Sequence, residues 1–64
     1  MGISLITYIN RMRVEKAQVM LLTSHDNLET IAQQVGFEDV FYFSRLFKSI
    51  VGISPAKYRK QLLL

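Results

Sequence analysis

Cysteine is missing from this 64-residue chain, and histidine occurs only once. Without cysteine the chain can form neither a disulfide nor a thiolate metal site, so packing alone must hold the fold. The single histidine, His25, lies in a polar turn, and with no second histidine, no cysteine and no convergent carboxylates we expect no metal site. No apolar run approaches the roughly 18 residues of a spanning helix, so we expect no membrane segment. These absences predict one small domain without metal or cofactor.

The charge and the apolar content both point to a partner. The formal net charge is +3 and the pI is about 9.6, which favours an anionic partner. Half of the residues are apolar, although a domain of this size buries only roughly 60% of the surface that its unfolded chain exposes. We therefore expect apolar surface to be left over for a partner. A cytoplasmic location is expected because the sequence shows neither a spanning run nor a charged-then-apolar leader.

The spacing of the apolar residues predicts an all-α fold, because it follows helical turns and nowhere alternates as in a strand. Residues that prefer caps stand at the expected helix starts: Ser4, either Asp26 or Asn27, Asp39, and Ser54 before Pro55. The predicted helices span residues 5–22, 27–35, 39–50 and 55–62.

Two helix faces are expected to build the core. In the first helix Ile6, Ile9, Ala17 and Met20 share one face, and in the third helix Phe43, Leu46, Phe47 and Ile50 recur at i, i+3, i+4 and i+7. Arg13 falls on the first of these faces. We expect its stem to be covered and its guanidinium to bond to backbone carbonyls rather than to DNA.

The two middle helices are joined by a short turn that contains Gly36. Two short helices with such a turn are typical of a helix-turn-helix, whose second helix enters a DNA major groove. If Phe43 and Phe47 point inward, the opposite face of residues 39–50 should meet the DNA. The candidate contacts are Val40, Phe41, Tyr42, Ser44, Arg45 and Lys48.

The chemistry of this face suits a nucleic acid. Arg45 can grip a guanine edge or a phosphate, Lys48 suits a phosphate, and Phe41 could touch a thymine methyl group. A basic helix face is more often simply solvated. The helix-turn-helix spacing and the outward aromatic side chain both weigh against that alternative here.

From Ile31 to Arg59 the sequence reads IAQQVGFEDVFYFSRLFKSIVGISPAKYR, which resembles the second helix-turn-helix of the AraC family of bacterial transcription regulators. The residues Arg13-Val14, Ala17 and Leu21-Leu22 resemble the family's linker helix. The resemblance implies a four-helix, homeodomain-like subdomain that binds double-stranded DNA. Its parts would be a linker helix at 4–22, the helix-turn-helix at 27–50 with 39–50 in the major groove, and a C-terminal helix at 54–62.

A sequence frame occurs twice, as GISLITY at 2–8 and as GISPAKY at 52–58. In the family that the chain resembles, each of two helix-turn-helix modules ends in such a turn. We therefore expect residues 1–64 to be a partial DNA-binding domain that lacks the first module. The first helix should then expose apolar surface, through which the chain would self-associate or contact RNA polymerase.

Two functions stay open: DNA binding through residues 39–50, and a protein-interaction module that uses the apolar first helix. Val40 and Phe41 stand where the family often has polar residues, so base readout there would be apolar or absent. No enzyme is expected, since Ser44 has no base within one turn and the acidic residues sit mostly at helix starts. Lys57, Arg59 and Lys60 could flank the DNA backbone or be solvated, and Leu62–Leu64 are expected to pack on a neighbour.

Overall fold

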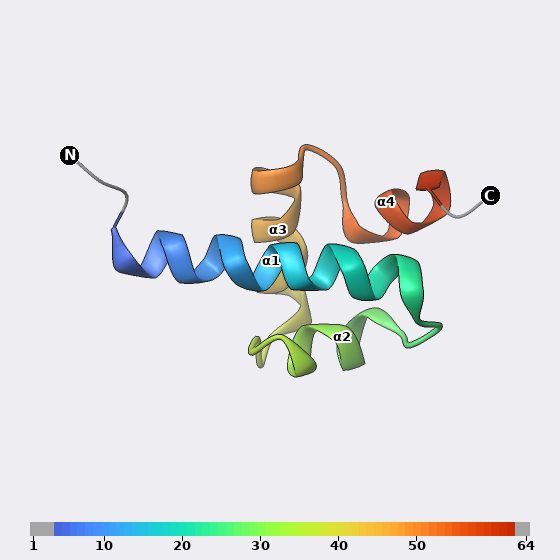
Figure 1. Ribbon diagram of the computed structural model, residues 1–64, viewed down its shortest axis with the longest axis horizontal. Helices are drawn as coiled ribbons and strands as arrows, with labels where there is room; N and C mark the ends of the chain where they lie inside the picture. Colours follow the sequence, from blue (N-terminus) through green and yellow to red (C-terminus); the bar gives the residue numbers. More distant parts are fainter. Residues whose placement is uncertain (1–3, 63–64) are drawn as a thin grey trace.

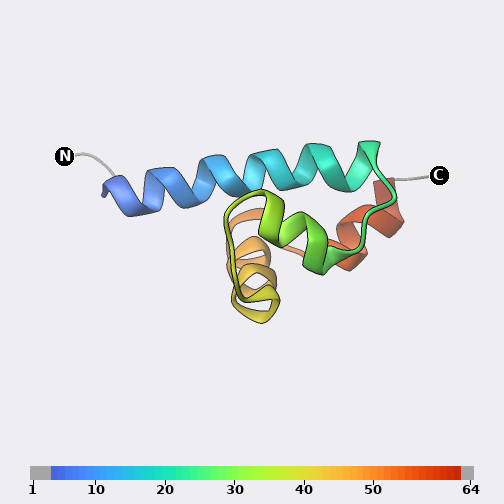
Figure 2. The ribbon, with the colours of Figure 1, turned by 90° about the horizontal axis from the view of Figure 1, so that it is seen from below.

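The long helix α1 organises the molecule. The computed structural model describes residues 4–62, and its helices are α1 (Leu5–Thr23), α2 (Leu28–Gln34), α3 (Val40–Val51) and α4 (Pro55–Leu62). In Figure 1, α2 and α4 lie on either side of α1, and α3 runs across it. Figure 2 shows that α2, α3 and α4 all lie on the same side of α1. This confirms the all-α fold, and among residues 4–62 the three shorter helices all pack on one side of α1.

The helix boundaries follow from the caps. Each predicted boundary is right to within one residue, and α4 has the predicted span. Asn27 caps α2 by accepting a hydrogen bond from the Thr30 amide at 2.8 Å, so the alternative cap at Asp26 is wrong. Asp39 caps α3, accepting from the Phe41 amide at 2.8 Å. Both caps have extended backbone and stand outside their helices, which is why α2 and α3 begin one residue later than predicted.

The repeated sequence frame is a helix start. Ser4 accepts a hydrogen bond from the Thr7 amide, and Ser54 accepts one from the Lys57 amide, both at 3.1 Å. The backbone bonds correspond as well, since Tyr8 and Tyr58 donate to the carbonyls of Ser4 and Ser54. Gly2 and Ile3 lie outside the described residues. Within the described part of the chain, the two copies therefore share an N-cap and the first turn that follows it.

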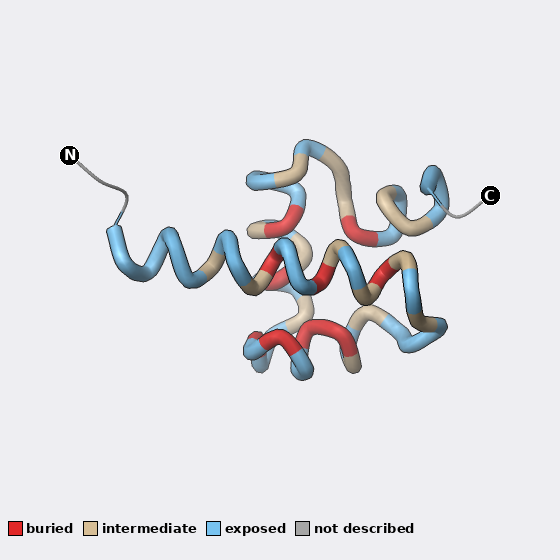
Figure 3. The backbone as a smooth tube through the Cα atoms, viewed as in Figure 1, coloured by how far each residue is buried: buried red, intermediate tan, exposed pale blue. Residues whose placement is uncertain are grey.

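The core consists of nine buried apolar residues drawn from α1, α2, α3 and the turn before α3 (Figure 3). Aromatic rings connect it: the Phe37 and Phe43 centroids are 5.4 Å apart, those of Phe43 and Phe47 5.8 Å, and those of Phe47 and Tyr58 5.5 Å. This row of rings links the turn, α3 and α4. The buried set is Val14, Ala17, Leu21, Ile31, Ala32, Val35, Phe37, Phe43 and Phe47.

The predicted inner face of α1 is largely wrong. Only Ala17 of the four residues is fully buried, whereas Ile6 is 73% exposed and Ile9 36%. The face that packs consists of Val14, Ala17 and Leu21, at i, i+3 and i+7. The reason is visible in Figure 2, where the N-terminal half of α1 extends beyond the other helices. Ile6 therefore has no neighbouring helix to pack against.

The expectations for the ends of α3 and α4 are also partly wrong. Ile50 was expected in the core but is 37% exposed near the end of α3, while Leu46 packs partly against the core. Leu62 is 54% exposed and does not pack as expected, and Leu63 and Leu64 lie outside the described residues. The single buried residue of α4 is Pro55. The apolar pattern thus overestimates the core at the ends of α3 and α4.

Arg59 holds α4 to the end of α1. Its Nε donates to the Leu21 carbonyl at 3.0 Å and its Nη2 donates to the Ser24 carbonyl at 3.1 Å. The last carbonyls of a helix lack partners within the helix, and a cation near them also complements the helix dipole. The expectation that Arg59 is a merely solvated charge is therefore wrong, and its guanidinium is engaged by two backbone carbonyls.

We predict that Arg59→Lys lowers the unfolding midpoint by roughly 5–15 °C, because lysine keeps the charge but cannot reproduce the two-pronged contact. The measurement is thermal unfolding followed by far-UV circular dichroism. Lys60→Arg is the matched control, since Lys60 is exposed on the same helix. Equal midpoints for Arg59→Lys and the wild-type chain would contradict this prediction, because they would show that water hydrogen-bonds to the two carbonyls as favourably as Arg59 does.

Candidate nucleic-acid interface

The turn between α2 and α3 has a defined hydrogen-bond pattern. The Phe37 amide donates to the Ala32 carbonyl at 2.8 Å and the Gly36 amide donates to the Gln33 carbonyl at 3.1 Å. This pair of bonds is the Schellman motif, which ends a helix with one residue in a left-handed conformation. Gly36 is that residue, with φ of 104°. The turn is thus closed by backbone bonds, and the chain then enters α3 through the Asp39 cap.

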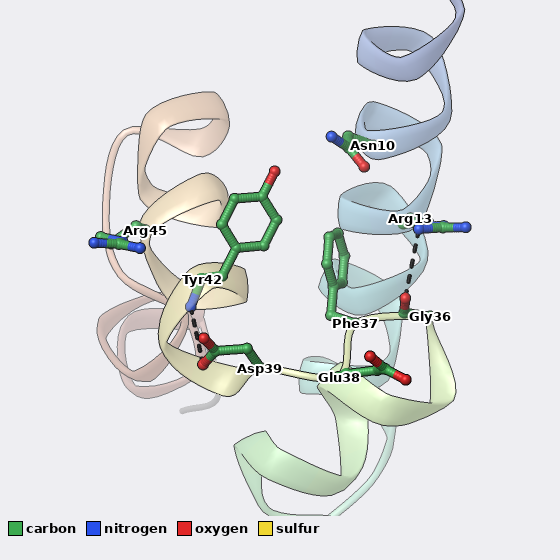
Figure 4. A pocket seen from close by; sticks show the side chains of 8 residues that line it. All are labelled: Asn10, Arg13, Gly36, Phe37, Glu38, Asp39, Tyr42 and Arg45. Carbon is green, nitrogen blue, oxygen red and sulfur yellow. Dashed lines mark hydrogen bonds between the residues drawn. The ribbon is translucent and has the colours of Figure 1, made fainter.

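Arg13 ties this turn to α1. Its guanidinium lies 5.7 Å from the centre of the Phe37 ring, and its Nη1 donates to the Gly36 carbonyl at 3.4 Å (Figure 4). The expected role of Arg13, a partly covered side chain bonded to backbone, is confirmed. One charged side chain therefore fixes the helix-turn-helix against the long helix.

The outward face of α3 is set by its inward face. Phe43 and Phe47 are fully buried, and at about 100° per residue Phe41, Arg45 and Lys48 fall on the opposite side. All three are exposed, and Phe41 is 77% exposed. In Figure 4, Arg45 extends from α3 away from Phe37 and Arg13. The face thus presents two cations one turn apart and an exposed aromatic ring.

The other three candidates are less accessible. Val40 packs against the core, Ser44 is half-buried, and Tyr42 is 44% exposed with its ring 6.0 Å from that of Phe37. Ser49, which the sequence reasoning missed, is exposed one turn beyond Arg45. Counting four residues from Arg45 along the helix would have found it. The structure therefore divides the six candidates into an exposed group and a group near the core.

An open cleft of about 590 Å³ lies beside this face, between the middle of α1 and the start of α3 (Figure 4). It contains cations and carboxylates together. Asp39 is already used as a helix cap, and Arg13 is held by Gly36 and Phe37. The lining residues are Asn10, Arg13, Gly36, Phe37, Glu38, Asp39, Tyr42 and Arg45.

Residues 4–62 contain no group of three or more histidine, cysteine, aspartate or glutamate side chains able to hold a metal ion. In the same range, none of the helices has the length and apolar character needed to cross a membrane.

Four helices with this turn and this exposed basic face define a helix-turn-helix protein. The family model described as a helix-turn-helix domain matches residues 1–61. The chain belongs to this family, that of the AraC-type transcription regulators. The family consists of DNA-binding regulators rather than enzymes.

Proteins with sequences similar to this chain are named as transcription regulators. The chain is 47% identical over 60 residues to an uncharacterized HTH-type transcriptional regulator, YisR, of Bacillus subtilis, covering 94% of this chain and 21% of the relative. It is 37% identical over 59 residues to the arabinose operon regulatory protein of Escherichia coli, covering 92% and 20%. The chain thus spans about a fifth of the length of these curated relatives.

Solved structures show the same fold. The C-terminal domain of AraT, a response regulator from Geobacillus stearothermophilus, superposes with a TM-score of 0.94 at 38% identity, over 98% of this chain and 52% of that domain. The C-terminal domain of the two-component response regulator yesN from Fusobacterium nucleatum gives 0.87 at 46% identity, over 91% and 56%. The match therefore accounts for about half of each solved domain.

We predict that Gly36→Ala destabilises the fold more than Gly52→Ala. The two glycines have nearly the same φ, 104° and 102°, so each substitution costs about 1–3 kcal/mol of backbone strain. A Cβ on Gly36 would also lie 3.0 Å from Arg13 Nε, whereas a Cβ on Gly52 would meet nothing within 4 Å. The difference between the two variants measures the contact with Arg13.

Urea unfolding followed by circular dichroism gives both free energies of unfolding. The Gly52→Ala variant is the control for the shared backbone strain. If the two variants lost the same stability, Arg13 would be free to move aside and its contact with the turn would contribute little.

Proposed function

We propose that this chain binds double-stranded DNA by placing α3 in the major groove, as part of a bacterial transcription regulator. The observation that carries the proposal is the pair of exposed cations, Arg45 and Lys48, on the α3 face opposite the buried Phe43 and Phe47. A helix of this width fits the major groove, and the face opposite its buried side is the part that can reach the bases.

Each exposed side chain has a role that follows from its chemistry. Arg45 carries a planar fork of donors that matches the guanine edge or a phosphate. Lys48, one turn further along, suits a phosphate as a point charge. Ser44, half-buried on the core side of these two residues, can donate to either a base or a phosphate. Tyr42 and Val40 support α3 near its start more than they reach outward.

Phe41 gives this interface an apolar component. A 77% exposed aromatic side chain is unusual unless something covers it, and the thymine methyl group is the apolar feature of the major groove. We therefore assign Phe41 to contact with thymine.

The proposal places the chain in the bacterial cytoplasm, where its DNA target lies, and treats residues 1–64 as a partial DNA-binding domain. One α3 reaches one stretch of major groove, so the chain by itself should bind DNA weakly. A contact with RNA polymerase belongs to the same proposal. The exposed apolar side chains of α1 favour an association surface in addition.

We predict that Arg45→Ala weakens DNA binding and flattens its dependence on salt. Each phosphate contact releases counterions and contributes about 0.9 to the slope of log K against log salt, so losing one contact lowers the slope by about that amount. Fluorescence anisotropy of a labelled mixed-sequence duplex, titrated at several salt concentrations, measures both quantities.

Lys60→Ala is the control, because it removes the same unit charge from an exposed position on α4. It should change affinity much less than Arg45→Ala. If the two variants lost affinity equally, binding would reflect net charge alone. If the wild-type chain failed to bind at low salt, the DNA proposal would be wrong for this chain.

We predict that Phe41→Ala leaves the free energy of unfolding within about 0.5 kcal/mol of wild type, because the ring is mostly exposed, but weakens DNA binding. Replacing the thymines of the duplex by deoxyuridine, which removes only the methyl groups, should weaken the wild-type complex and leave the Phe41→Ala complex unchanged. Equal sensitivity of both proteins to that replacement would exclude Phe41 as the methyl contact.

A further inference from the structure

The charges of this chain are unevenly distributed along the sequence. All five aspartates and glutamates precede Val40, whereas five of the eight lysines and arginines follow it. From α3 onward the sequence is therefore purely cationic. Of these five cations, Arg59 is engaged by two backbone carbonyls. The other four are exposed: Arg45, Lys48, Lys57 and Lys60.

Two of the exposed lysines line one cleft at the turn between α3 and α4, the orange loop at the top of Figure 1. The cleft has a volume of about 170 Å³. Lys48 borders it from the last turn of α3, and Lys57 borders it from the first turn of α4. No carboxylate is among the described residues that line it, which are Lys48, Gly52, Ile53, Ser54 and Lys57.

Backbone hydrogen bonds fix the positions from which the two lysines extend. Gly52 ends α3 in a left-handed conformation, and its amide donates to the Lys48 carbonyl at 2.8 Å. Ser54 then caps α4 by accepting from the Lys57 amide at 3.1 Å. Pro55, the first residue of α4, is buried. A ligand in this cleft therefore has to order only the side-chain stems of the two lysines, and not the backbone.

The chemistry of this cleft suits a phosphate. Two ammonium groups with no carboxylate beside them leave an excess of positive charge, which an anion neutralises. Lysine binds phosphate as a point charge, without the planar geometry that arginine requires. The cleft offers no aromatic ring, guanidinium or amide side chain for reading the edge of a base. The cleft is therefore better matched to a nucleic-acid backbone than to its bases.

The cleft adjoins the face of α3 that is proposed to meet DNA, because Lys48 belongs to both. Phosphates of both strands border the major groove, and contacts to them set the register of a protein on the duplex. Lys57 comes from a different helix, so it extends the cationic surface from α3 onto α4.

We propose that Lys48 and Lys57 together hold one phosphate of the DNA backbone, at the edge of the major groove that α3 occupies. This inference rests on the proposed function. It assigns to the DNA backbone the side chain of Lys57, for which the sequence left two alternatives open. Since a phosphate contact carries no base information, the pair positions α3 in the groove and does not select a sequence.

The salt dependence of binding tests this site. An exposed lysine–phosphate contact is weak by itself, so removing either lysine should release the phosphate. Lys48→Ala, Lys57→Ala and the double variant should therefore each lower the slope of log K against log salt by about 0.9, the value for one phosphate. The affinity lost by Lys57→Ala should then be about three- to fourfold larger at about 50 mM salt than at about 200 mM.

Two matched variants control for charge and position, and fluorescence anisotropy with the same labelled duplex measures all of them. Lys57→Arg keeps the cation and should keep the wild-type slope. Lys60→Ala removes a cation from the same helix but outside the cleft, and should leave the slope unchanged. Circular dichroism checks the fold, which alanine at the exposed helical position 57 should not disturb.

The outcomes separate this site from the proposed function. If the wild-type chain binds DNA and Arg45→Ala weakens it, but Lys57→Ala behaves like Lys60→Ala, the phosphate site alone is wrong. A fall in slope of about 1.8 for the double variant would mean two separate phosphates and would overturn the shared site. If the wild-type chain does not bind at low salt, the proposed function and the phosphate site are both wrong.

Discussion

The burial of Phe43 and Phe47 against α1 is the constraint on which the rest of the structure depends. These are the two largest fully buried side chains, and they continue a row of rings from Phe37 to Tyr58. Because a helix is stiff, fixing this face fixes the rotation of α3 about its axis. The exposure of Arg45 and Lys48 is a direct consequence, so the candidate DNA face is determined by the core.

Net charge alone is a poor guide to this interface. The chain has eight lysines and arginines, yet Arg13 donates to the Gly36 carbonyl and Arg59 donates to the carbonyls of Leu21 and Ser24. These two cations fasten the turn and α4 to α1, because carbonyls at helix ends need donors that the helix itself does not supply. The cations on the outward face of α3 are therefore a minority of the basic residues.

The parts of the fold that local chemistry determines could be predicted from the sequence. Caps such as Asp39, the left-handed glycines and the inward face of α3 depend on neighbours within a few residues. The rotation of α1 could not be predicted, because this helix has two apolar faces and periodicity does not say which one packs. The role of Arg59 was equally hidden, since its acceptors lie 35 and 38 residues away in the sequence. At the candidate site, the exposure of Phe41 was predictable, whereas the packing of Val40 against the core depends on tertiary contacts.

The two apolar faces of α1 also bear on the functions that the sequence left open. One face, Val14, Ala17 and Leu21, is buried in the core. The apolar side chains roughly opposite Val14 are exposed; they are Leu5, Tyr8, Ile9, Met12 and Val19. The α3 face that carries Arg45 and Lys48 is set by the burial of Phe43 and Phe47 and not by these exposed side chains of α1. The proposed DNA contacts of α3 can therefore be tested by substitutions that leave α1 unchanged.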